Sequence, residues 1–314
     1  MKKLTKPLLT LLLAFGMGVP AHAQGTEWEK LNSEVASLYA QGHYDRAVVV
    51  AKKALQVAEK AVGPDHPIVA TSLNYLAALY QAQGRYALAE PLFKRLLAMV
   101  EKGLGPDHPD VATSLNSLAG LYQAQGRYAL VEPLFKRALA IREKVLGPDH
   151  PDVAASLNNL AELHRTQGRY AQAEPFVKRS LAIMEKAFGP DHPNVATSLN
   201  NLAELHRTQD RYAQAEPLFK RSLAIMEKAF GPDHPDMARS LNNLALLYQA
   251  QGRYAKAEPL FKRSLAINEK ALGPDHPNVA LNLESMAALY RETGREKEAE
   301  ISENRVTAIR AIKR

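Results

Sequence analysis

Gly63-Pro64-Asp65-His66-Pro67 is a pentapeptide that recurs unchanged along the chain. It begins six times, always 42 residues apart, at Gly63, Gly105, Gly147, Gly189, Gly231 and Gly273. A fixed period in this range is typical of a solenoid built from repeated supersecondary units. Alignment on the pentapeptide gives seven units, the last of which is cut short by the C-terminus. The units start near residues 26, 68, 110, 152, 194, 236 and 278.

The second unit shows what each repeat contains. Leu73, Leu76 and Tyr80 have the spacing of one face of a helix. Gly84 interrupts this pattern, and a second apolar periodicity then continues to the next pentapeptide. We therefore expect an all-α fold of paired antiparallel helices. Because neither helix of a pair can cover its apolar face alone, each hairpin must stack on its neighbours.

The pentapeptide is the expected joint between units. Glycine suits the left-handed position after a helix, and the following proline prevents continuation. Either Asp107 or His108 can accept the free N–H groups of the next helix, and Pro109 suits its first turn. Equivalent points on packed helices lie about 8–10 Å apart, whereas Zn–N bonds are about 2.0–2.1 Å. One histidine per joint therefore predicts capping, with no metal and no cofactor.

The second unit also carries a family resemblance. Residues 73–80, followed by Gly84-Arg85-Tyr86, Ala89 and Phe93, resemble the tetratricopeptide signature of large, small and aromatic positions. The 42-residue period, with Ala-Glu-Pro-Leu-Phe-Lys-Arg at 89–95, is similar to the variety found in kinesin light chains and many bacterial proteins. The resemblance implies a right-handed superhelical solenoid of about seven helix-turn-helix repeats. It also implies a concave groove that binds extended peptides.

The N-terminal segment has the pattern of a secretory signal. Lys2, Lys3 and Lys6 precede an apolar run over residues 8–18, and Ala21-His22-Ala23 follows. A spanning helix needs roughly 20 apolar residues, which this run does not reach. We expect a signal peptide over 1–23 with cleavage after Ala23, and a solenoid over 24–314 whose C-terminal part is a capping helix. The expected location is periplasmic or secreted, without a membrane span.

Charge and motif content limit the possible functions. Removal of the signal takes the formal charge from +7 to +4, because the segment holds three lysines and no acidic residue. Pairs such as Lys94-Arg95 recur beside Glu90 and Glu101, which indicates a solvated mixed-charge surface and no nucleic-acid partner. The chain has no cysteine, and no catalytic motif occurs in it. We therefore expect no enzyme activity.

One face of each first helix holds the candidate binding residues, and its asparagines form a ladder. An asparagine offers both a donor and an acceptor to the backbone of an extended ligand, and the resemblance implies this role. The alternative is that the asparagines bond between adjacent helices. The ladder comprises Asn32, Asn74, Asn116, Asn158, Asn200 and Asn242.

The same face becomes charged in the central repeats, at Glu162, Arg165, Glu204 and Arg207. One interpretation is that these groups select a charged or polar ligand segment. The alternative is that they form solvated intrahelical pairs, each worth about 0.2–0.5 kcal/mol.

Two functions follow from this organisation. The first is a protein-interaction adaptor that binds an extended peptide or a partner's surface in the groove. The alternative is a structural element that assembles through its end faces, which the near-identical repeats favour and the polar last helix opposes. We expect a monomer or weak self-association, and the sequence does not identify the partner.

Overall fold

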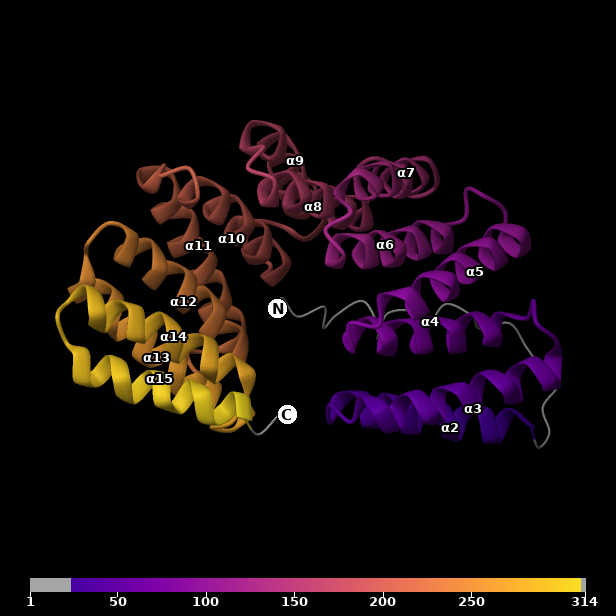
Figure 1. The fold of residues 1–314 in the computed structure, drawn as a ribbon. Coiled ribbons are helices and arrows are strands. Elements are labelled where there is room, and N and C mark those ends of the chain that lie inside the picture. Colours follow the sequence, from indigo (N-terminus) through magenta and orange to yellow (C-terminus); the bar gives the residue numbers. More distant parts are fainter. Residues whose placement is uncertain (1–23, 312–314) are drawn as a thin grey trace. The chain divides into compact units, whose positions relative to one another are not determined.

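The computed structural model describes residues 24–311, and these form fourteen α-helices without a strand (Figure 1). The predicted signal segment lies outside the described residues. The helices are α2 (Gln24–Ala40), α3 (Tyr44–Val62), α4 (Pro67–Ala82), α5 (Tyr86–Leu104), α6 (Pro109–Ala124), α7 (Tyr128–Leu146), α8 (Pro151–Thr166), α9 (Tyr170–Phe188), α10 (Pro193–Arg207), α11 (Tyr212–Phe230), α12 (Pro235–Ala250), α13 (Tyr254–Leu272), α14 (Pro277–Glu292) and α15 (Glu296–Ala311).

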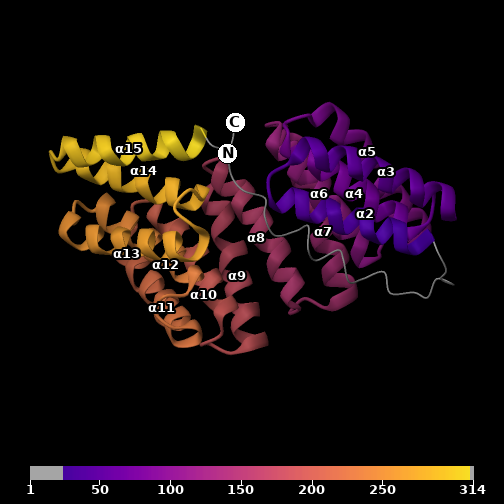
Figure 2. The same ribbon diagram turned by 90° about the horizontal axis from the view of Figure 1, so that it is seen from below.

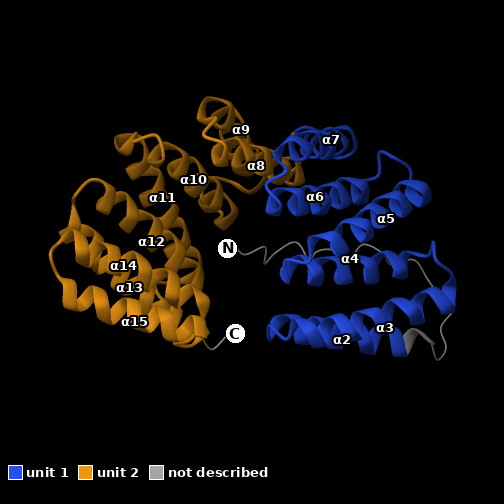
Figure 3. Cartoon of the chain, in the orientation of Figure 1, with its two compact units in different colours: residues 1–148 blue, residues 149–314 orange. Residues whose placement is uncertain are grey.

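The chain divides into two compact units, residues 1–148 (unit 1) and residues 149–314 (unit 2) (Figure 3). Within each unit, an even-numbered helix and the odd-numbered helix after it form a hairpin. Inside unit 1 and inside unit 2, consecutive hairpins contact one another in the order of the chain, as two views of the ribbon show (Figures 1 and 2). The prediction of an all-α solenoid of about seven helical hairpins is confirmed.

Histidine is the residue that caps each first helix after a joint. The Nδ1 atom of His66 accepts from the backbone N–H of Ile68 at 3.3 Å, and that of His108 accepts from Asp110 at 3.2 Å. Gly63 before the cap has φ +85°, a left-handed conformation that a glycine adopts without strain. Of the two predicted capping residues, the histidine caps the helix, and the aspartate has another role.

That role is a bridge between repeats. Asp65 accepts from Lys102 Nζ of the next hairpin at 2.6 Å. Arg95 of the same hairpin pairs with Glu59 at 2.7 Å and donates to the carbonyl of Pro64 at 3.3 Å. The aspartate bridge recurs as Lys144–Asp107, Lys186–Asp149, Lys228–Asp191 and Lys270–Asp233. Part of the mixed surface charge therefore forms ordered pairs that connect consecutive hairpins.

The apolar residues that define the repeat form the core. Leu73 is fully buried, and Leu76, Tyr80 and Phe93 are at most 5% exposed. In unit 2, Phe219 and Phe261 occupy the position of Phe93 and are also fully buried. Contacts of this kind lie between neighbouring helices, so each interface stabilises both of the hairpins that share it.

The first and last hairpins replace such core residues by polar ones. Glu34 in α2 is exposed, whereas the equivalent residue of the next repeat, Leu76, is buried. Trp28, also in α2, donates from its indole N–H to Ser72 Oγ of α4 at 2.9 Å. In α15, Glu303 stands at the position of buried Phe261. Arg310 stands at the position of buried Val100 and Met226. These substitutions give each end a polar outer face, as terminal repeats require for solubility.

Candidate functional site

The six predicted groove asparagines lie on the first helices, and none of them is fully exposed. Asn32, Asn74 and Asn200 are buried, with 5–8% of their surface exposed. The half-buried members are Asn116, Asn158 and Asn242. Asn32 Nδ2 donates to the carbonyl of Trp28 at 3.0 Å, one turn earlier in its own helix. The ladder therefore lies at the border between the core and the exposed face.

Asn200 bonds between helices. Its Nδ2 atom lies 3.1 Å from the carbonyl of Ala196, 2.5 Å from Ser222 Oγ and 3.2 Å from Ser240 Oγ. Ser222 Oγ in turn donates to the Ala196 carbonyl at 2.8 Å. These groups come from α10, α11 and α12, so the amide joins two hairpins of unit 2. This environment favours the structural interpretation for Asn200.

A second buried polar network surrounds Asn242. Its Oδ1 atom accepts from Asn282 Nδ2 at 3.1 Å, and the same Nδ2 lies 2.8 Å from Ser264 Oγ. Asn268 Nδ2 donates to Asn282 Oδ1 at 2.5 Å. Asn268 and Asn282 are 7% and 3% exposed. The network connects α12, α13 and α14, so Asn242 also has a structural role.

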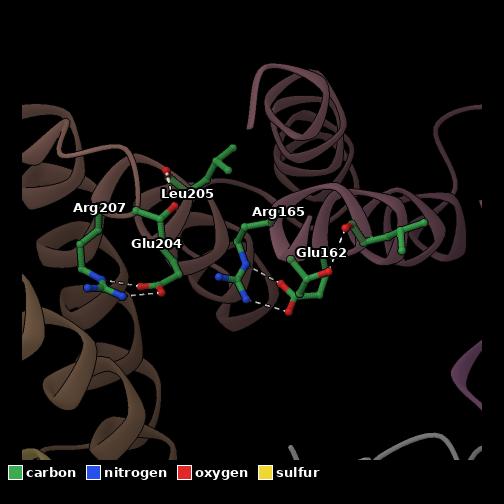
Figure 4. Close-up of polar contacts among 8 residues, drawn as sticks. Glu162, Arg165, Glu204, Leu205 and Arg207 are labelled. Atoms are coloured by element: carbon green, nitrogen blue, oxygen red, sulfur yellow. Dashed lines mark hydrogen bonds and ion pairs between the residues drawn. The ribbon is translucent and has the colours of Figure 1, made fainter. Parts of the chain in front are cut away.

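The predicted charged residues form two bidentate pairs on neighbouring first helices of unit 2 (Figure 4). Arg165 in α8 donates through Nε and a terminal nitrogen to Glu162 at 2.6 and 2.7 Å. Arg207 in α10 contacts Glu204 in the same way at 2.8 and 2.7 Å. The hydrogen bonds from Arg165 to Glu162 raise the pKa of Arg165, and the charge of Glu204 raises it further. Each guanidinium is thus satisfied within its own helix.

A shallow hollow of about 420 Å³ begins beside Arg207 and extends across α12 and α14. Its lining combines small, apolar and polar side chains from three consecutive first helices of unit 2. The helices are neighbours, since α12 contacts both α10 and α14. The lining residues are Arg207, Leu246, Gln249, Ala250, Glu284, Ser285, Ala288 and Glu292.

His206 is a further polar residue that the repeat pattern singles out. It is 6% exposed and stands at a position that is tyrosine in other repeats. One of these, Tyr248, donates from its hydroxyl to Glu216 of α11 at 3.1 Å. Burial lowers the pKa of His206, and its Nδ1 has no hydrogen-bond partner among the described residues. His164, at the same position of α8, stacks on Phe176 with ring centroids 5.7 Å apart. Both histidines therefore belong to the packed interior.

Sequence reasoning missed part of this arrangement. Glu292 was not singled out, although the equivalent residue is alanine or threonine in every other repeat. Asn268 and Asn282 were missed as well, although they stand where the preceding repeat has Met226 and Ser240. In each case the signal was a departure from the repeat.

The sequence of residues 30–311 matches the tetratricopeptide repeat in six overlapping segments. The segments are 30–102, 69–144, 110–186, 152–228, 199–270 and 236–311. The chain belongs to the tetratricopeptide repeat family. Proteins of this family bind protein partners, so the chain is a protein-interaction scaffold, of a class that is in general non-catalytic.

Solved structures with related repeats share the architecture of this tetratricopeptide protein. A kinesin light chain from Podosopora anserina with nearly identical TPR-like repeats is 25% identical, with a TM-score of 0.57, over 67% of this chain and 99% of that chain. BtubC from P. vanneervenii is 23% identical, with a TM-score of 0.57, over 81% and 94% of the two chains. RapI in its apo form is 15% identical, with a TM-score of 0.65, over 91% and 98%. The similarity to kinesin light chain-like repeats, predicted above, is confirmed.

A comparison with curated protein sequences found no match. Within residues 24–311, no helix has the length and apolar character needed to cross a membrane.

Proposed function

We propose that this tetratricopeptide protein is an adaptor that binds an extended segment of a partner protein on the exposed face of its first helices, in the hollow of unit 2. The hollow carries the proposal, because its lining comes from α10, α12 and α14. An extended ligand that lies across these helices can contact three repeats at once. Each net hydrogen bond contributes about 0.5–1.5 kcal/mol, so a few bonds with buried apolar area support micromolar binding, at about −8 kcal/mol.

The predicted groove residues have different parts in this proposal. Asn200 and Asn242 hold the hairpins in register beneath the face, since their amides bond within the protein. The pair Glu204–Arg207 forms one edge of the hollow. The ligand therefore contacts mainly the small and apolar residues beyond that edge, including Leu246 and Ala288.

The end faces give less support to self-assembly. Stacking of one chain on another would bring exposed Glu34 and Ser37 of α2 to positions that inner repeats fill with Leu76 and Leu79. At the other end, Glu303 is already held by Arg291 at 2.8 Å. Desolvation of these groups without partners is unfavourable. We propose a monomeric adaptor in the periplasm or outside the cell, and light scattering of the purified protein tests its oligomeric state.

The experiment on function is a pull-down from an envelope extract, read by mass spectrometry. Ala288→Trp fills the hollow, whereas Ala308→Trp adds the same side chain at an exposed position of α15. We expect the wild type and Ala308→Trp to retain the same partner and Ala288→Trp to lose it, with unchanged melting of both variants. Equal capture by the two variants contradicts the proposal.

A further inference from the structure

We propose that the hollow of unit 2 binds a lysine or arginine side chain of an extended, basic partner segment. This inference rests on the proposed function and adds the chemical class of the partner. It is based on which polar groups in the lining have hydrogen-bond or ion-pair partners inside the protein and which do not.

Two of the three charged residues that line the hollow are already compensated. Arg207 donates two hydrogen bonds to Glu204, at 2.8 and 2.7 Å. Glu284 forms an ion pair with Arg310 of α15. Ser285 Oγ donates to the carbonyl of Leu281 at 3.1 Å. Each of these groups already has a partner inside the protein.

Glu292 differs from them. Its carboxylate, at the end of α14, is exposed, and no hydrogen bond or ion pair joins it to another residue in the described range 24–311. The neighbouring Arg291 is directed elsewhere, since it bonds to Glu303 through Nε and a terminal nitrogen at 2.9 and 2.8 Å. Gln249 adds a buried side-chain oxygen that accepts no hydrogen bond from any residue the structure describes. The lining therefore holds one negative charge without an ion-pair partner and one buried oxygen without a donor among the described residues.

The rest of the lining suits the stem of a long cationic side chain. Leu246, Ala250 and Ala288 add apolar and small side chains to the lining that also contains Arg207 and Glu292. Lysine and arginine place their methylene groups on such surfaces and keep the charged end in contact with polar groups. An acidic side chain would be repelled by Glu292, whose charge has no ion-pair partner in the described range, while the charge of Arg207 is already compensated by Glu204.

The repeat itself supports a specific role for Glu292. The equivalent residues are Ala40, Ala82, Ala124, Thr166, Thr208 and Ala250. A capping function does not account for the glutamate at position 292. The substitutions that cap the last hairpin, such as Glu303, stand at positions that are buried against a following hairpin in other repeats. Position 292 is exposed or half-buried in all repeats. The carboxylate is thus added on the open face of the first helices.

The test measures binding of short capped peptides to the purified protein by fluorescence anisotropy. One peptide alternates lysine with serine and alanine, and two counterparts carry glutamate or glutamine in place of each lysine. We expect the lysine peptide to bind, with an affinity that falls as salt is added. Glu292→Gln should weaken it about tenfold, the loss expected for one charge-assisted hydrogen bond. Glu300→Gln on α15 removes the same charge from an exposed site outside the hollow and should leave binding unchanged.

The outcomes separate this inference from the proposed function. If the glutamate or glutamine peptide binds as tightly as the lysine peptide, and Ala288→Trp abolishes that binding, the hollow is a binding site but its basic preference is wrong. If Glu292→Gln and Glu300→Gln bind the lysine peptide equally well, or if no peptide binds, the inference is overturned. The adaptor proposal is still decided separately, by whether Ala288→Trp loses the partner in the pull-down.

Discussion

The two units fill the same buried position of their second helices with different chemistry. In unit 1 the position is apolar, and in unit 2 it is serine in three successive hairpins. The residues are Ala54, Leu96 and Ala138 in unit 1, and Ser180, Ser222 and Ser264 in unit 2. Ser222 and Ser264 donate to the carbonyls of Ala196 and Ala238 at 2.8 and 2.6 Å. The same hairpin fold thus accommodates either an apolar side chain or a buried hydrogen-bonded one at this position of the second helix.

The comparison shows what the polar version requires. A buried hydrogen-bonded network stabilises a protein only when its members are satisfied. In unit 2, Ser222 pairs with Asn200 and Ser264 pairs with Asn282, whereas the hydroxyl of Ser180 has no hydrogen-bond partner among the described residues. An apolar contact has no such condition. At this position, stability in unit 1 therefore depends on the volume of the side chain, and in unit 2 it depends on hydrogen-bond partners.

The largest effect is expected from Leu96→Ser, which gives unit 1 the residue of unit 2. Leu96 is 2% exposed, and removal of its side chain costs about 3.5 kcal/mol, within the range for a truncated core leucine. The control Ser222→Ala loses two hydrogen bonds, to the Ala196 carbonyl and from Asn200 Nδ2, and should cost less, about 2 kcal/mol. Chemical unfolding followed by circular dichroism measures both. Equal costs for the two variants contradict the distinction between the units.

The next largest effect is expected from Asn282→Ala in unit 2. The change removes the partner of Asn268 and Asn242, and buried groups left without a bond cost about 2–3 kcal/mol in total. The double variant Asn268→Met with Asn282→Ser restores the residues of the preceding repeat and should recover most of this loss. Thermal melting compares the three proteins, and a double variant as unstable as Asn282→Ala would argue against the network.

The units also share a feature, which predicts similar acid sensitivity. Hydrogen bonds from Lys220, Arg253 and Tyr248 lower the pKa of Glu216 from 4.5 to about 2. The ionised carboxylate therefore stabilises the folded state above about pH 4.5, and this contribution is lost as the pH falls toward 2.

Glu216→Gln should cost about 1 kcal/mol at neutral pH, after allowance for solvent screening, and should reduce the loss of stability on acidification. Glu90 in unit 1 contacts Lys94, Arg127 and Tyr122 in the same way, and these bonds lower its pKa. Glu90→Gln is therefore the matched variant. Melting temperatures recorded from pH 7 to pH 3 test both, and a steep acid transition that persists in Glu216→Gln would refute the assignment.

The smallest effect is a gain in unit 2. His206→Tyr introduces the hydroxyl that Tyr122 and Tyr248 direct at a glutamate, here Glu174, and should stabilise the protein by about 0.5–1 kcal/mol. It also removes the loss of stability below about pH 6.5, because burial lowers the pKa of His206 and the unfolded chain binds the proton more readily. His164→Tyr is the control without gain, because Phe176 already stacks at that position. Calorimetry at pH 5 and pH 8 distinguishes the two variants.

The hairpins and joints could be predicted from sequence because their determinants are local. Leu73, Leu76 and Tyr80 define a helix face within eight residues, and Gly63 with Pro64 ends the preceding helix. The bridge from Lys102 to Asp65 could not be predicted in this way, since it spans 37 residues and depends on how hairpins stack. For the same reason, the predicted groove residue Asn200 proved to bond inside the protein, and the hollow became visible only in three dimensions.

The histidine-capped joint, with its lysine bridge, makes the length of this protein adjustable in whole repeats. Excision of residues 194–235 would place Lys270 at the same distance along the chain from Asp191 that Lys228 has now. The shortened chain would therefore re-form an equivalent bridge at the new junction. Gain or loss of a complete repeat changes how far the molecule reaches while leaving its connections intact, so natural variation in this chain is expected to come in steps of one repeat.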